Sequence, residues 1–356
     1  CESSKTKNNQ TDNDDMYKIY WEDTKMEFSA TAGTAGGSLK ALFEVRDGDN
    51  LENFKGKVTK ADSYSLTVEN MSIDNIKSLN LPDKDGKITV NNISYSYDSW
   101  EAQVDAQGNI KSVTFNLSKD KAIADPEKTV AEGYLLNAGS AINARGIPYY
   151  MTQLNEFVRN FSEMFNQIES KGQNLNGDTP PTFFEAITNT AKVYDFSESE
   201  AYSKLPDGQT ATINSSSNTY YRMTAANFSV NKDVMNDVSL FATSTDYVKT
   251  DSCDIVDELK KLQSEKTVYR GDKAESFLET IISNVSVDTE KAETYNKLYS
   301  NLEQTIANQR TSVSGVDEDE EALNLVKFQY SYNMASKIIS VMNQMLDKLI
   351  NDTGVA

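Results

Sequence analysis

The chain has 356 residues, and 38% of them are hydrophobic, which is enough for two or three packed domains. Its 54 acidic and 35 basic side chains give a net charge of −19, so nucleic-acid phosphates and anionic lipid surfaces should be repelled. Histidine is absent and there are only two cysteines, which excludes the usual general base, zinc cages and histidine-based nucleophile pairs.

The first fifty residues predict an arm, a strand and a helix. Residues 1–15 are polar and rich in Asn and Asp, which predicts a disordered arm. Apolar and polar side chains alternate at the start of 17–28, as in a strand. An amphipathic pattern over 38–47 predicts a short helix that ends at Gly48. We assign 16–50 to a core domain.

A period of two residues follows and predicts antiparallel strands over 51–143. Turn residues stand between the alternating runs, for example at 85–86 and 107–109. The alternating sets are Tyr64, Leu66 and Val68, then Ile93, Tyr95 and Tyr97, and finally Val113, Phe115 and Leu117. We therefore predict an inserted β-rich domain over this range.

Residues 144–170 predict a core helix that begins near Pro148, since proline is tolerated in a first helical turn. Gly172 marks its end. Its heptad-like apolar stripe consists of Tyr150, Leu154, Phe157, Phe161, Met164 and Ile168. We interpret this stripe as an ordinary core face. Residues 171–250 are polar and predict a mixed, mainly β domain.

Residues 251–356 predict a helical C-terminal assembly region. Asp272, with Glu275 three residues later, indicates the beginning of one helix. Asp288 indicates a second, longer helix that ends near Arg310.

The last helix carries the strongest pattern in the chain. Asp317 and Glu320 stand at capping-box spacing and predict its start. Apolar side chains then alternate at gaps of three and four residues, as in a coiled coil. This predicted assembly seam consists of Leu325, Phe328, Tyr332, Ala335, Ile339, Met342, Leu346 and Leu349. A single helix cannot bury such a seam, so either an earlier part of the chain or another subunit must cover it.

These elements predict an α+β fold with an inserted antiparallel β domain, a mixed middle region and a long-helix C-terminal region with a heptad seam. The acidic run 317–321 is better explained by the positive end of a helix than by a metal site. Catalysis by carboxylates alone is compatible with the composition, but no acid pair stands out. We predict no catalytic, cofactor-binding or metal-binding residue. The sequence also contains no apolar run of about eighteen residues, so no transmembrane segment is predicted.

Residues 312–351, SVSGVDEDEEALNLVKFQYSYNMASKIISVMNQMLDKLIN, contain a turn, an acidic cap and a long helix with a Lys-Phe-Gln triplet. They resemble the C-terminal end of the FlgK family of bacterial flagellar hook-associated proteins. Residues 36–50, 146–166 and 224–245 are also similar to it. The β-rich insertion lies between two segments that usually form one block in the family.

The resemblance implies a structural subunit of the hook–filament junction and no enzyme. Such a subunit self-assembles through its terminal helices into a ring with neighbouring flagellar hook and junction or filament proteins. The resemblance further implies export by the flagellar type III apparatus to the extracellular flagellum. It also implies that the export chaperone FlgN binds the terminal helices before assembly.

The resemblance covers the later part of such a protein, without the N-terminal helices that pair with the C-terminal ones. Without those partner helices, we expect 318–351 to be detached, self-paired or folded back on 288–310. On this interpretation Cys1 is a fragment end; the other possibility is a lipidated N-terminus. The alternative function is a secreted or lipid-anchored cell-surface protein that binds carbohydrate or acts as an adhesin. Tyr64, Tyr95, Tyr97 and Trp100 would then stack on sugars, although at this spacing they fit one face of a sheet.

Overall fold

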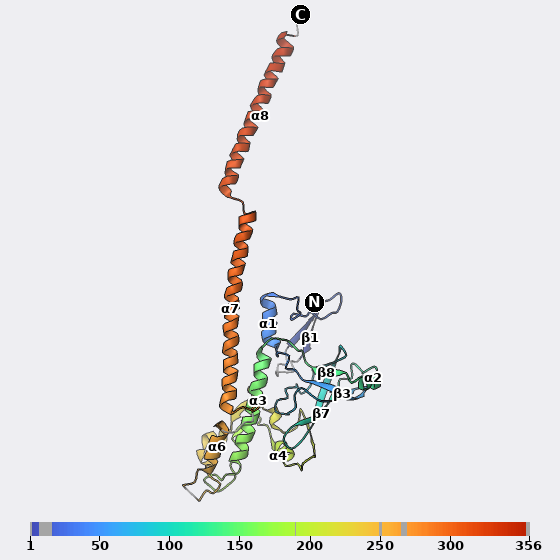
Figure 1. Cartoon of the computed structure of the whole chain (residues 1–356), viewed down its shortest axis with the longest axis vertical. Coiled ribbons are helices and arrows are strands. Elements are labelled where there is room, and N and C mark those ends of the chain that lie inside the picture. The colour runs from blue at the N-terminus through green and yellow to red at the C-terminus, as the bar shows by residue number, and fades with distance from the viewer. Residues whose placement is uncertain (1, 7–15, 189, 249–250, 265–268, 354–356) are drawn as a thin grey trace. The chain divides into compact units, whose positions relative to one another are not determined.

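The computed structural model describes residues 2–6, 16–188, 190–248, 251–264 and 269–353. The chain divides into two compact units, Cys1–Ile282 and Ser283–Ala356. Figure 1 shows both helices and strands, and the predicted α+β class is confirmed. None of the described helices is both long enough and apolar enough to cross a membrane.

The N-terminal segment forms a hairpin in place of part of the predicted arm. Strand β1 (Glu2–Thr6) pairs antiparallel with β2 (Met16–Tyr20), because this pairing satisfies backbone groups that a free arm would leave to water. The rest of the arm, residues 1 and 7–15, lies outside the described residues. Strand β2 is shorter than predicted because the chain turns back after it, with the Trp21 N–H donating to the Met26 carbonyl (2.9 Å). The predicted helix is confirmed as α1 (Gly37–Asp47).

A closed antiparallel barrel of six strands follows α1. Its strands are β3 (Lys55–Asp62), β4 (Ser65–Glu69), β5 (Gly86–Val90), β6 (Ile93–Val104), β7 (Ile110–Leu117) and β8 (Leu135–Ala138). They are ordered β6-β5-β8-β3-β4-β7, and pairing of β6 with β7 closes the ring. Short β10 (Ala211–Asn214) adds to β6, and α2 (Pro126–Ala131) contacts β3.

The barrel core is built from the alternating side chains that the sequence indicates. A β-bulge between Tyr97 and Ser99 shifts the register of β6, so that both Tyr97 and Trp100 point inward and are fully buried. The Tyr97 hydroxyl and the Trp100 Nε1–H each donate to the Pro82 carbonyl (3.2 Å). Their polar atoms are therefore satisfied inside an apolar core.

The barrel is inserted between α1 and α3 (Ile147–Glu169), and its two connections leave from one point. The Gly146 N–H donates to the Gly48 carbonyl (3.0 Å), which brings the two connections together. A Cβ atom on Gly48 would lie 2.6 Å from the Ala144 carbonyl oxygen, so this close approach requires glycine.

Helix α3 organises the first unit, and its predicted apolar stripe is a core face. The N-terminal half of the stripe packs on Tyr269 and on Phe277 and Ile281 of α7 (Ala274–Ser314). The C-terminal half packs on α6 (Asp254–Ser264). Phe157 stacks on Tyr269 with ring centroids 5.1 Å apart.

The other side of α3 holds the barrel through a buried arginine. Arg159 donates to the carbonyls of Leu79 (2.6 Å), Met223 (2.8 Å) and Lys77 (3.0 Å). Its guanidinium also lies 4.6 Å from the centre of the Tyr221 ring. The inserted barrel is thus attached to the body of the first unit by more than its two connections.

Short elements make up the mixed middle region that follows α3. Strand β9 (Phe184–Ala186) pairs antiparallel with β11 (Phe228–Val230). Helices α4 (Ser197–Ser203) and α5 (Lys232–Asn236) and the 3-10 turns η1 (Tyr220–Arg222) and η2 (Val238–Leu240) flank this pair.

The C-terminal region consists of two long helices, α7 and α8 (Glu318–Thr353). The prediction of separate helices from Asp272 and Asp288 is wrong, because α7 runs continuously through both stretches. Neither glycine nor proline occurs within α7, so nothing interrupts its hydrogen bonding. Helix α8 begins where the sequence predicts.

Candidate assembly surface

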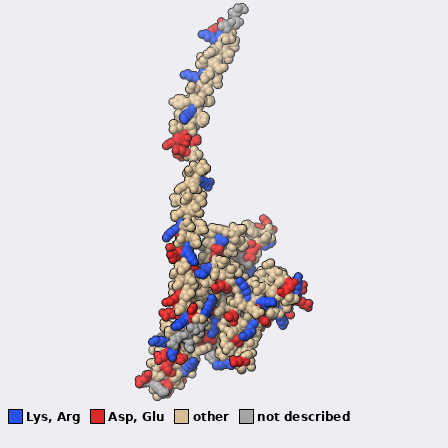
Figure 2. Space-filling model, in the orientation of Figure 1, with Lys and Arg blue, Asp and Glu red and all other residues tan. Residues whose placement is uncertain are grey.

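Asp317 fixes the start of α8. Its Oδ1 accepts hydrogen bonds from the backbone N–H groups of Asp319 (2.9 Å) and Glu320 (3.4 Å), as an N-cap residue does. Acidic side chains fill the first turn, and Figure 2 shows them as a red cluster at this end of α8. Carboxylates there interact favourably with the positive end of the helix dipole. Among the described residues, no group of three or more acidic or cysteine side chains could hold a metal ion.

The eight residues of the predicted assembly seam all lie on α8, and all are exposed. The exposure of its large members runs from 52% at Leu346 to 76% at Tyr332, and Ala335 is exposed as well. Singly exposed apolar residues are normal on protein surfaces, but a contiguous apolar stripe marks an interaction site. The surface of α8 in Figure 2 is accordingly mostly uncharged beyond its first turn.

A second apolar stripe on α8 was missed by the search for a heptad. It consists of Leu323, Val326, Tyr330, Met334, Ile338, Val341 and Met345, all exposed. Its gaps of 3, 4, 4, 4, 3 and 4 residues average about 3.7, close to the period of a straight helix. In the C-terminal half of α8 the two stripes are neighbours, so the apolar arc is wider than one partner helix covers. A search for all helical periods, and not only 3.5, would have found this signal.

The part of α7 in the second unit carries a stripe of its own. The stripe consists of Val285, Ala292, Tyr295, Tyr299, Leu302, Ile306 and Val313, again at heptad spacing, with the polar residues Asp288 and Gln309 in the pattern. Its apolar members are exposed, for example Tyr295 at 56% and Ile306 at 54%. Because both helices expose their stripes, 318–351 does not fold back on 288–310, and of the three expected arrangements the single chain shows the detached one.

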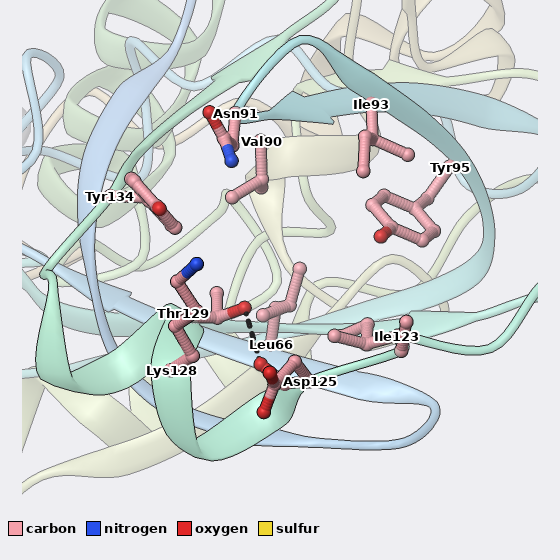
Figure 3. Close-up of a pocket in the computed structure, with 11 residues that line it drawn as sticks. Leu66, Val90, Asn91, Ile93, Tyr95, Ile123, Asp125, Lys128, Thr129 and Tyr134 are labelled. Atoms are coloured by element: carbon pink, nitrogen blue, oxygen red, sulfur yellow. Dashed lines mark hydrogen bonds between the residues drawn. The ribbon is translucent and has the colours of Figure 1, made fainter.

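A pocket at one end of the barrel is too small to compete as the main site. Figure 3 shows its apolar floor, which includes Leu66 and Tyr95, and a polar rim that includes Asp125, Lys128 and Thr129. Its volume is about 190 Å³, below the range of about 300–1,000 Å³ typical of small-molecule sites. The sequence does not predict this pocket, because its wall combines a hairpin turn and α2, which are far apart in the chain.

The aromatic residues considered for sugar stacking are mostly inside the barrel. Tyr97 and Trp100 are fully buried and Tyr95 is 7% exposed, so the stacking interpretation is wrong for these three. Closure of the barrel turns their faces inward, as the alternative interpretation of one sheet face implied. Tyr64 alone of the four is exposed, at 43%.

The first unit contains a carboxyl group that is buried, in contrast to the exposed acidic side chains in the first turn of α8. Glu169, in the last turn of α3, is 1% exposed. Burial raises the pKa of its carboxyl from 4.5 to about 7, and the N–H of Ala242 offsets part of this effect. The charged form of Glu169 is therefore costly in the folded chain.

Comparison with known proteins finds a family match over the end of α7 and nearly all of α8. Residues 307–352 match the family described as flagellar basal body rod FlgEFG protein C-terminal. Over 341 residues the chain is 21% identical to flagellar hook-associated protein 1 of Bacillus subtilis (strain 168), an alignment that covers 94% of this chain and 56% of that relative. The chain thus spans about half the length of the curated relative that it matches.

No solved structure matches the chain. The matched proteins are flagellar structural proteins and not enzymes. Together the two similarities support a structural component of the bacterial flagellum of the hook-associated kind.

Proposed function

We propose that this chain is a subunit of the hook–filament junction, of the FlgK type, that assembles through the exposed stripes of α7 and α8. The observation that carries the proposal is the exposed seam on α8. The family match over 307–352 supports it, because that range takes in nearly all of α8. The position at the junction rests on the resemblance of 312–351 to the FlgK family.

Burial of the seam provides the driving force for assembly. Each Leu, Ile, Phe or Met that leaves water contributes about 1.5–3 kcal/mol, before the entropy of association is subtracted. The second stripe requires contacts on another side of the helix. A ring of neighbouring subunits, in contact with hook and filament proteins, covers both stripes at once. No chemical step is involved.

The decisive experiment places charge on the seam in the complete protein of a flagellated host. The double variant Ile339→Asp and Met342→Asp should abolish the hook–filament junction, because two carboxylates cannot be buried without partners. The double variant Asn333→Asp and Gln344→Asp adds the same charge on the polar side of α8 and should assemble normally. Electron microscopy and motility report assembly. Normal flagella in the first variant would show that the seam is not the assembly surface.

Before assembly, the exposed seam of α8 must be shielded from water by another protein. On this proposal the protein leaves the cell through the flagellar type III apparatus, and FlgN shields the terminal helices until then. Co-purification of FlgN with the complete protein should be lost in the seam double variant and kept in the polar-side double variant. Equal recovery of FlgN with both variants would contradict this part of the proposal.

A further inference from the structure

A second pocket lies wholly within the first unit, where the end of α3, strand β9 and the segment before α4 meet. Its volume is about 370 Å³, within the range of small-molecule sites. Apolar and aromatic side chains form part of its wall, including Pro180, Pro181, Tyr194, Phe196 and Tyr220. Phe196 stacks on Tyr220 with ring centroids 4.3 Å apart, which holds the wall in place.

Most polar side chains around this pocket already have partners. The Asn166 amide donates to the Phe184 carbonyl and to the Tyr220 hydroxyl (both 2.8 Å). The Asn231 amide donates to the Thr182 carbonyl (3.0 Å). The Asp195 carboxylate accepts from the backbone N–H and the hydroxyl of Ser197. The lining is therefore ordered without a ligand.

Two carboxylates, Glu169 and Glu185, are the exceptions, and both oxygens of Glu169 are buried without a hydrogen-bond partner among the described residues. Glu185 lies on β9, on the opposite face from the core residue Phe184, lines the pocket and is 6% exposed. No described residue donates a hydrogen bond to its carboxylate, and Lys232 of α5 makes no ion pair with it among the described residues. Burial raises the pKa of Glu185, with a further increase from Asp233 and a decrease from Lys232. The carboxylate oxygens of Glu185 are not among the fully buried atoms, so they are open to the pocket, where a donor from outside the chain can reach them.

The charge of the lining decides the class of that donor. Every described charged residue that lines the pocket is acidic, namely Glu169, Glu185 and Asp195. A divalent ion such as Ca²⁺ takes about six to eight oxygen ligands, and the described residues hold no acidic cluster suited to a metal. An ammonium group, in contrast, brings three hydrogen-bond donors on an apolar stem, which suits one carboxylate within aromatic and proline walls.

We propose that this pocket binds a primary alkylammonium group, from the lysine side chain of another protein or from a small free amine. The ammonium donates to Glu185, and the methylene groups contact the apolar wall. The pocket is separate from the helices of the second unit. Its test can therefore fail while flagellar assembly through α8 holds, and the reverse also applies.

Binding is measured on the complete chain at pH 8 by NMR or calorimetry, with three probes of similar length. They are 1,5-diaminopentane, N-acetyl-lysine methylamide and the neutral 1,5-pentanediol. The two amines should bind and the diol should not. Glu185→Gln should weaken amine binding at least about tenfold, which corresponds to about 1.4 kcal/mol. Glu198→Gln, a change nearby but outside the lining, should leave binding unchanged.

Thermal unfolding separates loss of the site from loss of the fold. Glu185→Gln should unfold at the same or a higher temperature, because it removes a buried charge that lacks a partner. Binding of the lysine derivative assigns the pocket to a protein lysine, and binding of the diamine alone assigns it to free amines. Absence of amine binding, equal binding of the diol, or unchanged affinity in Glu185→Gln overturns the proposal.

Discussion

Helices α3 and α8 carry apolar stripes of the same spacing, but only the stripe of α3 is covered by other parts of the chain. The stripe of α3 is covered by α6 and by the first turns of α7, whereas every residue of the α8 seam is exposed. The opposite side of α3 is polar and still buried, because Arg159 and its neighbours bind the barrel. Spacing alone thus identifies an apolar helix face that must be removed from water. The rest of the chain determines whether the same chain or another subunit packs on that face.

The largest expected effect tests the covered side of this comparison. Arg159→Met removes hydrogen bonds to three carbonyls and leaves buried acceptors unsatisfied, which should destabilise the first unit by about 3–5 kcal/mol. Urea unfolding followed by the fluorescence of buried Trp100 measures this change. The helicity of α8 should not change. A loss below about 1 kcal/mol would mean that water replaces the guanidinium.

A matched pair of truncations compares the two stripes directly. Phe157→Ala should cost about 2–3 kcal/mol, because a half-buried ring leaves the contacts with Tyr269 and Phe277. Phe328→Ala, on the exposed seam, should change the unfolding free energy of the single chain by less than about 0.5 kcal/mol. Equal losses in the two variants would show that the α8 seam is packed within the chain in solution.

The last test concerns pH and belongs to the first unit alone. Because the pKa of Glu169 rises from 4.5 to about 7, the folded state binds more protons than the unfolded state between these values. Its stability should therefore fall as pH rises through this window and stay lower above it. Glu169→Gln should stabilise the chain by about 2–3 kcal/mol at pH 8 and by almost nothing at pH 4. Chemical unfolding at the two pH values checks this, and an equal gain at both would exclude titration as the cause.

Local signals predicted several elements well. Gly48, Pro148 and Asp317 marked helix ends that the structure confirms, because caps and breakers act within a few residues of their position. The same kind of signal failed at Asp288, where an acidic residue lies inside the continuous helix α7. Without a nearby glycine or proline, a possible cap does not end a helix.

The barrel shows where local reasoning stops. Period-two runs predicted strands, but closure of β6 onto β7 depends on a register that no single run contains. The bulge between Tyr97 and Ser99 also shifts the alternation of inward and outward side chains along β6 by one residue, and this shift places Trp100 inside the barrel. The pocket around Glu185 had no signal in the sequence, since it joins residues from α3, β9 and the segment before α4.

The sequence by itself determined the fold class, the helix ends set by caps and breakers, and the heptad spacing of the eight apolar residues on α8, because each depends on neighbours within a few helical turns. Tertiary structure decided which apolar stripe is buried, which tyrosines face inward and which carboxylates lose water. These outcomes depend on the approach of segments far apart in the chain. Whether an apolar face or a charge is buried, and therefore its free energy in the folded chain, depends on which distant segments pack against it. The local sequence pattern does not contain this information.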